Sequence, residues 1–449
     1  MKYLATASIL PRITMPATTQ PASLLGALIL LGASPVGLGN GMRLVSQDAF
    51  AAARGEAFAA TADNASAVHY NPAGLTQLSG HNFRSGFNAL YYEPTYRPPA
   101  GAPNAGTKYE VEDNTAIAPQ FYYAYRFDDL PVSLGLGMYA PHGASITWPQ
   151  DTGFRAVATE GELSYLRINP VLAVEVLPGL SLAAGVMVDY GDIRLEQGLL
   201  RTERPFANNF RFEGDDWSVG YNLGLLWQVN EQVSVGATLR SATTMEFDGK
   251  TKFVQQPIIR PTTLDADAEF EFPMTAVFGI SYRPTPEWNL ELNVDYTDWS
   301  SFDTVTVHQD GRPPRPVQQD IPFTLNWKDS WMYKIGVTRY LENGWQVSAG
   351  YLFNENSVPD DYYTPLVADL DRHFLSIGLG RRGKRFDIDA TYQLGFGSKN
   401  KVSDSTPPTH PGRYDRQDAD WTYDYTSHAL LVSLGWRFSG GNNFDRISG

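Results

Sequence analysis

The feature that most constrains the fold is a period-two alternation of apolar and polar residues, which recurs from His81 almost to the end of the chain. Residues 288–296 (WNLELNVDY) and 386–394 (FDIDATYQL) are clear examples. Successive side chains of a β-strand point to opposite faces, so each segment predicts a strand with one apolar and one polar face. The chain beyond residue 80 is therefore predicted to be all-β.

The connections between these segments alternate between long and short. About fourteen strands can be counted, an even number. Long connections include 249–265 and 298–329, and short ones include Asn230-Glu231 and Arg382-Gly383. Outer-membrane barrels combine short periplasmic turns with longer outer loops. We therefore predict a transmembrane antiparallel β-barrel of about 14 strands, closed because lipid offers no hydrogen bonds to a free strand edge.

Composition agrees with a barrel and excludes several classes of function. Aromatic residues make up 13% of the chain, 40 residues are glycine and the mean hydropathy is −0.29, which argues against a bundle of transmembrane helices. A net charge of −14 without a basic cluster excludes nucleic acid as a partner. The absence of cysteine excludes disulfides, thiolate metal sites and cysteine nucleophiles.

The N-terminus predicts export. An apolar run at residues 24–33 (LLGALILLGA) follows Lys2 and Arg12 and is too short to span a bilayer of roughly 30 Å. It fits the apolar region of a signal peptide over residues 1–39, with the mature chain starting at Asn40 or Gly41. Combined with the strand pattern, this leader favours the outer membrane of a Gram-negative-type bacterium over a soluble exported protein.

Residues 41–80 lack strand periodicity and are rich in alanine and glycine. They contain Asn71-Pro72-Ala73-Gly74, where proline pushes the preceding residue out of the helical region and favours a turn. A compact, weakly apolar segment ahead of a barrel predicts a hatch inside the lumen. The expected domains are the hatch (41–80), the barrel (81–438) and a C-terminal tail (439–449).

Several motifs spread along the mature chain resemble one family. They are ADNASAVHYNPAGL (62–75), YAPHG (139–143), DYTDWSSF (295–302), WKDSWMYKIGVTRYLENGWQVSAGY (327–351), Ser357-Val358-Pro359 and Asp371-Arg372. With these motifs the chain resembles the FadL/TodX family of outer-membrane transporters for long-chain fatty acids and other hydrophobic compounds. One departure is the tail of eleven residues after Phe438, because members of that family usually end on the aromatic residue itself.

The resemblance implies a hatch motif at Asn71, Pro72, Ala73 and Gly74, which either shifts when ligand binds or only shapes the plug. It also implies a kinked third strand with a lateral opening, which maps to Pro141 and Gly143. Proline cannot donate a ladder hydrogen bond and glycine permits unusual backbone angles, so a strand break is plausible there on physical grounds too. An ordinary strand end is the alternative.

The resemblance further implies cations for a ligand carboxylate, for which Arg194 and Lys328 lie in roughly corresponding regions. Such a pair would attract strongly where water is scarce. The alternative is that each cation pairs with a neighbouring acid.

No cofactor or metal is expected. The seven histidines lack metal-ligand spacing, and Gly378-x-Gly380-x-x-Gly383 joins two predicted strands without the helix that a dinucleotide site requires. Ser427-His428 and Asp371-Arg372-His373 lie in no recognisable catalytic motif, so an enzyme is not expected.

The sequence therefore predicts passive outer-membrane transport of hydrophobic molecules, foremost long-chain fatty acids, with a hatch shift and a lateral exit. Uptake of aromatic hydrocarbons is an alternative, as are a general porin and a barrel lipid hydrolase. We expect a monomer whose partners are the hydrophobic ligand, outer-membrane lipid and lipopolysaccharide.

Overall fold

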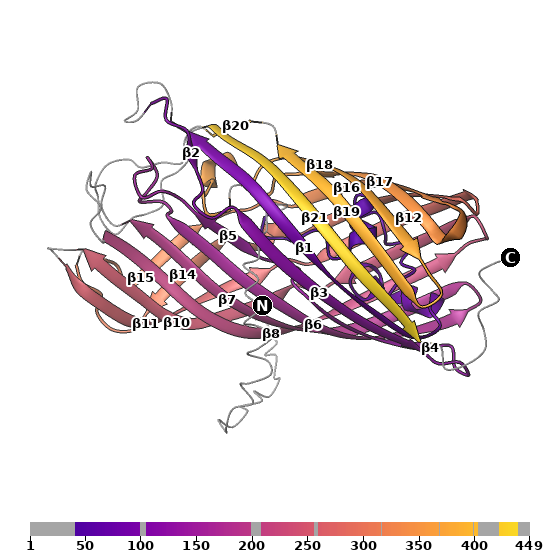
Figure 1. The fold of residues 1–449 in the computed structure, drawn as a ribbon. Helices are drawn as coiled ribbons and strands as arrows, with labels where there is room; N and C mark the ends of the chain where they lie inside the picture. The colour runs from indigo at the N-terminus through magenta and orange to yellow at the C-terminus, as the bar shows by residue number, and fades with distance from the viewer. Residues whose placement is uncertain are drawn as a thin grey trace, which may run out of the picture. The chain divides into compact units, whose positions relative to one another are not determined.

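A computed structural model describes residues 41–98, 105–198, 208–255, 259–315, 317–367, 369–397, 399–402 and 422–438. The predicted signal peptide (1–39) and the predicted tail (439–449) lie outside these residues, so both stay predictions. The described strands are long, tilted and antiparallel (Figure 1).

Fourteen antiparallel strands form a closed barrel, because β1 pairs with β3 on one edge and with β21 on the other. Nine strands are continuous: β1 (Gly80–Arg97), β3 (Thr115–Arg126), β6 (Glu160–Leu177), β7 (Leu180–Gly198), β8 (Asn208–Gln228), β17 (Trp345–Asn354), β18 (Arg372–Arg382), β19 (Phe386–Gly397) and β21 (Thr422–Phe438). The predicted all-β barrel is confirmed.

The other five barrel strands are each interrupted and consist of two pieces. They are β4 (Val132–Tyr139) with β5 (Ala144–Thr147), β9 (Val233–Arg240) with β10 (Thr243–Gln255), β11 (Ile259–Phe272) with β12 (Thr275–Thr285), β13 (Trp288–Thr297) with β14 (Thr304–Gln309), and β15 (Asp320–Thr324) with β16 (Ser330–Tyr340). Two short strands, β2 (Tyr109–Glu110) and β20 (Asn400–Lys401), extend the sheet at β1 and β21.

Strand alternation separates a lipid-facing surface from a polar lumen. On β13, Leu290 and Leu292 are exposed on the outside, whereas Asn289, Glu291 and Asn293 are buried toward the lumen. An apolar outer band is what a strand needs when its outside contacts lipid. The alternation predicted for residues 288–296 is therefore present, with its polar face turned toward the hatch.

Two predicted long loops are wrong in their extent. Within 249–265, β10 continues to Gln255 and β11 begins at Ile259, and within 298–329 the chain forms β14 and β15. The outward side chains of this region include exposed Asp248 and Asp267. The strands therefore continue where the outer face is polar, and the contrast between apolar and polar residues that reveals a strand in the sequence disappears.

The hatch fills the lumen with small, buried residues. It contains α2 (Ala49–Ala53), α3 (Ala67–Tyr70) and the 3-10 helix η1 (Pro72–Gln77). Asp48 caps α2 by accepting hydrogen bonds from the N–H groups of Phe50 and Ala51, at 3.0 and 3.2 Å. A Cβ atom at Gly350 would lie 1.9 Å from the Gly55 nitrogen, so glycine lets the hatch backbone contact the barrel wall. None of the helices in the described residues is long and apolar enough to cross a membrane.

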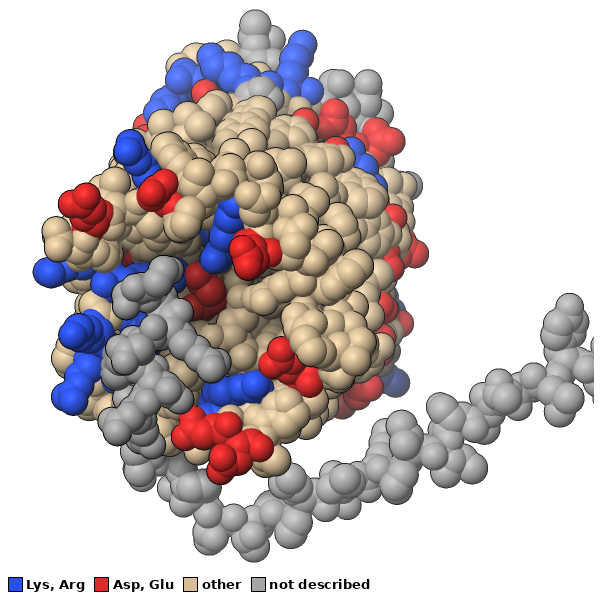
Figure 2. Space-filling view, turned by 90° about the vertical axis from the view of Figure 1, so that its right-hand side faces the viewer, with Lys and Arg blue, Asp and Glu red and all other residues tan. Residues whose placement is uncertain are grey.

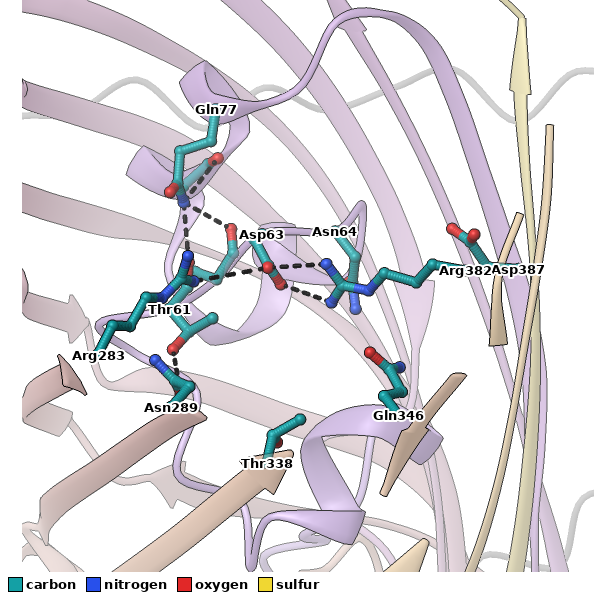
Figure 3. Close-up of polar contacts among 12 residues, drawn as sticks. Thr61, Asp63, Asn64, Gln77, Arg283, Asn289, Thr338, Gln346, Arg382 and Asp387 are labelled. Carbon is teal, nitrogen blue, oxygen red and sulfur yellow. Dashed lines mark hydrogen bonds and ion pairs between the residues drawn. The ribbon is translucent and has the colours of Figure 1, made fainter. Parts of the chain in front are cut away.

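Ion pairs connect the hatch to the barrel near the short turns that follow β12 and β18. Figure 2 views the molecule from this end, where charged side chains gather mainly around the rim. Asp63 of the hatch lies between Arg283 and Arg382 (Figure 3). Arg382 donates two hydrogen bonds to its carboxylate, at 2.9 and 3.1 Å, and Arg283 is 3.8 Å away. Deeper in, Arg84 on β1 joins Asp48 to Asp389.

The ion pairs of Asp63 with Arg382 and Arg283, called the Asp63 clamp below, predict that the stability of the protein depends on pH. Burial alone would raise the pKa of Asp63, but the charges of Arg382 and Arg283 and the hydrogen bonds from Arg382 lower that pKa to about 2. A carboxylate whose pKa is lowered by folding stabilises the folded state fully at pH values above its ordinary pKa. This contribution is lost as the pH falls through the lowered pKa. Asp63→Asn should therefore lower the free energy of unfolding by about 2 kcal/mol at pH 7 and should change it little near pH 2.

Urea unfolding of detergent-solubilised protein at several pH values measures this difference. Asp129→Asn, an exposed aspartate on a short turn at the same end, is the matched control and should change little. A penalty for Asp63→Asn that does not vary with pH would show that the clamp is not electrostatic.

Candidate functional site

A cavity with a volume of about 350 Å³ lies toward the long-loop end of the barrel. Its walls come from β5, β6, β7, β11, β14 and β15, from the hatch and from the segment after β17. The lining is mostly apolar and includes Met42, Ala144, Val157, Leu163, Ile193, Leu195, Phe270, Phe302, Val305, Phe323, Leu325, Trp327, Tyr363, Leu366 and Val367.

One wall of this cavity includes a cluster of aromatic rings at the interruption between β13 and β14. A short 3-10 helix, η2 (Trp299–Ser301), occupies the interruption, and the Phe302 N–H donates to the Trp299 carbonyl. The ring centroids of Phe302 and Trp327 are 4.8 Å apart, and those of Trp299 and Trp327 are 4.9 Å apart. Such edge-packed rings form a rigid apolar surface.

The cavity wall carries almost no charge. Among the described residues that line it there is no lysine or arginine, and Glu162 is the single acid. The neighbours of Glu162 on β6, Gly161 and Leu163, are buried, so strand alternation turns the glutamate side chain to the opposite face. There it pairs with Arg194 at 3.2 Å. The cavity therefore offers a ligand apolar contact and few polar partners.

The structure does not bring Arg194 and Lys328 into the cavity wall. Ile193 and Leu195 line the cavity, whereas Arg194 points the other way and contacts Glu160 and Glu162. Lys328 is exposed, and its backbone N–H donates to the Ser357 carbonyl at 2.9 Å. The period-two pattern of β7 already carried this information, because Arg194 is out of phase with its apolar neighbours.

The third barrel strand is interrupted at Pro141, His142 and Gly143, where the kink was expected. The lower piece, β4, pairs with both β3 and β6. The upper piece, β5, pairs with β6 but not with β3 among the described residues. The edge of β3 from Thr115 to Gln120 therefore lacks a ladder partner from the third strand.

The first described residues of the hatch pair with this interruption. Leu44 N–H donates to the Pro141 carbonyl and Gly143 N–H donates to the Met42 carbonyl, both at 2.9 Å, with Arg43 opposite His142. Met42 also lines the cavity. The segment 42–44 thus contacts both features, and the sequence analysis missed it because three residues show no periodicity.

The hatch motif anchors the base of the hatch to the barrel. Asn71 caps η1, and its side-chain amide donates to the carbonyls of Ala59 and Leu225 at 2.7 and 2.9 Å. A Cβ atom at Gly74 would lie 2.2 Å from the Ala62 carbonyl oxygen, so glycine allows this turn to pack closely. Whether the motif shifts on ligand binding stays a prediction.

No group of three or more histidine, aspartate or glutamate side chains within the described ranges could hold a metal ion.

Comparison with known proteins extends these observations. The model of a family described as outer membrane protein transport protein (OMPP1/FadL/TodX) matches residues 33–439. The chain is 23% identical over 391 residues to a long-chain fatty acid transport protein of Escherichia coli O6:H1, covering 75% of this chain and 82% of that protein. It is 24% identical over 419 residues to a putative outer membrane protein of Neisseria meningitidis serogroup B, covering 83% and 90%.

Two solved structures share the fold. A Pseudomonas aeruginosa FadL homologue has a TM-score of 0.74 at 17% identity, covering 88% of this chain and 99% of that one. The Pseudomonas putida toluene transporter TodX has a TM-score of 0.67 at 16% identity, covering 89% and 100%. The chain therefore belongs to the OMPP1/FadL/TodX family: it is a bacterial outer-membrane β-barrel that transports hydrophobic compounds and is not an enzyme.

Proposed function

We propose that the protein takes up long hydrophobic molecules, foremost long-chain fatty acids, by passive diffusion through the apolar cavity. The observation that carries this proposal is the cavity itself, with about 350 Å³ of space and a mostly apolar wall. An engineered cavity of roughly 150 Å³ already holds benzene, so this one has room for more than a single ring. Burial of each methylene contributes about 0.8 kcal/mol, which suffices for binding without strong polar contacts.

The carboxylate of a fatty acid would then lie outside the cavity wall. Lys328 is exposed and follows Trp327, which lines the cavity, so it remains a candidate partner for a carboxylate at the rim. Arg194 is a weaker candidate, because Glu160 and Glu162 already neutralise it.

Uptake of aromatic hydrocarbons is the second candidate function. The aromatic wall formed by Phe270, Phe302 and Trp327 and the lack of a lining cation favour an uncharged ligand. The relatives divide in the same way, since one is a long-chain fatty acid transport protein and another is a toluene transporter.

The proposed route leaves the cavity sideways. Ligand in the cavity would displace Met42, and movement of segment 42–44 would release the bonds at Pro141 and Gly143 and open the gap between β3 and β5. The Asn71 motif would serve as the fixed base about which the hatch shifts, because Asn71 is tied to the barrel. A general porin is disfavoured because the hatch occupies the lumen.

A charge placed in the wall should weaken binding. Val305 lines the cavity, and its neighbour Thr304 on β14 is exposed on the opposite face. We expect Val305→Glu to lower the affinity for palmitate at least tenfold, because the carboxylate must be desolvated beside an apolar chain. Thr304→Glu adds the same charge outside and should leave affinity within about twofold. Calorimetry with purified, folded protein measures both, and equal affinities would place the ligand elsewhere.

Affinity should rise with the length of the ligand. Each added methylene should strengthen binding by roughly fourfold until the cavity is full. A series of saturated fatty acids from decanoate to palmitate, with toluene for comparison, tests this in the same assay. Binding of toluene without binding of any fatty acid in the series would assign the protein to the hydrocarbon class.

Locking segment 42–44 to the strand break should stop transport. Arg43 and His142 face each other as an antiparallel pair whose flanking residues make the bonds, and such pairs have short Cα separations suited to a disulfide. The chain has no cysteine, so Arg43→Cys with His142→Cys introduces a single possible bridge. Fatty-acid uptake into cells should be lost when the pair is oxidised and regained after reduction. Arg43→Cys alone controls for the lost arginine, and unchanged uptake when oxidised would contradict the route.

A further inference from the structure

A second polar site lies between the hatch and the barrel, next to the interruption of the third strand. Four cations meet there from four separate segments: the half-buried Arg43 of the hatch, and the buried Arg167 on β6, Arg240 on β9 and Lys334 on β16. We infer that this group, called the cation cluster below, binds one monovalent anion, either a halide ion or a carboxylate group.

The cation cluster holds more positive than negative charge. Arg167 is neutralised by Asp189, to which it donates two hydrogen bonds of 2.7 Å each. Arg43 and Lys334 share one carboxylate oxygen of Asp295, at 2.8 and 2.6 Å. Two cations on one aspartate leave a surplus positive charge.

Arg240 adds a second surplus charge. It is 7% exposed, and no carboxylate of the described residues lies within ion-pair distance of it. Its guanidinium donates to the His69 carbonyl, whereas its Nε has no acceptor. Among the described residues that line the cavities beside the cluster, the remaining acid is Glu56, which accepts a hydrogen bond from the Tyr70 hydroxyl at 2.7 Å. Even with Glu56 ionised, four cations face three carboxylates, and an uncompensated buried charge costs several kcal/mol.

The space for a counter-ion is present. A cavity of about 20 Å³ lies among Arg43, Arg167 and Arg240, and none of the described residues that line it is acidic. By the same measure one water needs roughly 10–15 Å³, so a single atom of halide size or one end of a carboxylate fits. His142, which is buried and has no partner for its Nδ1, lines the same space. Three arginines around an acid-free cavity favour an anion over water.

The position of this cavity gives the anion a structural role. Pro141 and His142 belong to the strand interruption, and Arg43 belongs to the segment that pairs with it. A bound anion would therefore bridge segment 42–44 to β6 and β9 and hold the hatch closed. A free halide would have this role whether or not the protein transports fatty acids. Occupation by a substrate carboxylate rests on the proposed function.

Bromide tests the site directly. Crystals of the detergent-solubilised protein grown in sodium bromide should show one anomalous peak among Arg43, Arg167 and Arg240. The urea midpoint of the wild type should also be higher in sodium chloride than in sodium methanesulfonate of equal ionic strength, because methanesulfonate carries no carboxylate and is too bulky for this cavity. Both effects should be lost in Arg240→Gln, kept in Arg240→Lys, and kept in the matched control Arg339→Gln on the exposed face of β16. Circular dichroism confirms that each variant is folded.

Two further ligands identify the source of the anion. If palmitate removes the bromide peak and hexadecanol does not, the site receives the head group of the substrate, and Arg240→Gln should weaken palmitate about tenfold without affecting hexadecanol. If neither removes the peak, the site holds a free ion. A cavity without bromide, together with equal midpoints in chloride and methanesulfonate, would overturn the inference whether or not the protein transports fatty acids.

Discussion

The structure depends on one constraint, which is that a backbone inside a bilayer must satisfy every hydrogen bond within the protein. A sheet meets it by closing, as β1 does by pairing with β21. Fourteen strands then enclose a lumen too wide for the wall's own side chains to fill, and the hatch occupies it. The polar lumen face in turn supplies partners for the hatch. Glu291 accepts hydrogen bonds from the Ala60 N–H and the Thr61 hydroxyl, at 2.8 and 2.5 Å.

The break in the third strand leaves backbone groups outside the strand ladder, and the hatch supplies their hydrogen-bond partners. Pro141 and Gly143 lie outside the ladder, yet the carbonyl of one and the N–H of the other are satisfied by Leu44 and Met42. Gln47 of the hatch also donates to the Ala140 carbonyl at 2.7 Å. Any opening at this break would therefore involve the hatch, because moving segment 42–44 would leave these buried groups without partners. The same bonds that seal the gap would couple ligand entry to its opening.

The sequence predicts the architecture well because lipid and lumen impose opposite polarity on alternate residues. That signal fails at β14 and β15, whose outer faces carry polar residues such as Thr304 and Asp320. It locates the strand break only through Pro141 and Gly143. The sequence does not predict the cation cluster, because its members at residues 43, 167, 240 and 334 meet only after the barrel has closed around the hatch. Arg194 shows the converse, since its phase within β7 marks it as facing away from Ile193 and Leu195, a signal that the prediction from the family resemblance did not use.

The separation of an apolar cavity from a buried cation cluster has a consequence for selectivity. Apolar burial is not directional, so a wall of Phe302, Trp327 and their neighbours ranks ligands by size rather than by head group. Any preference for an acid over a neutral molecule must then come from charges outside that wall. Exposed Lys328 is screened by solvent and would contribute less than Arg240, which is buried without an acidic partner among the described residues. Discrimination between fatty acids and hydrocarbons would therefore depend on whether the ligand reaches the strand break, where its carboxylate would replace a counter-ion that otherwise holds the hatch in place.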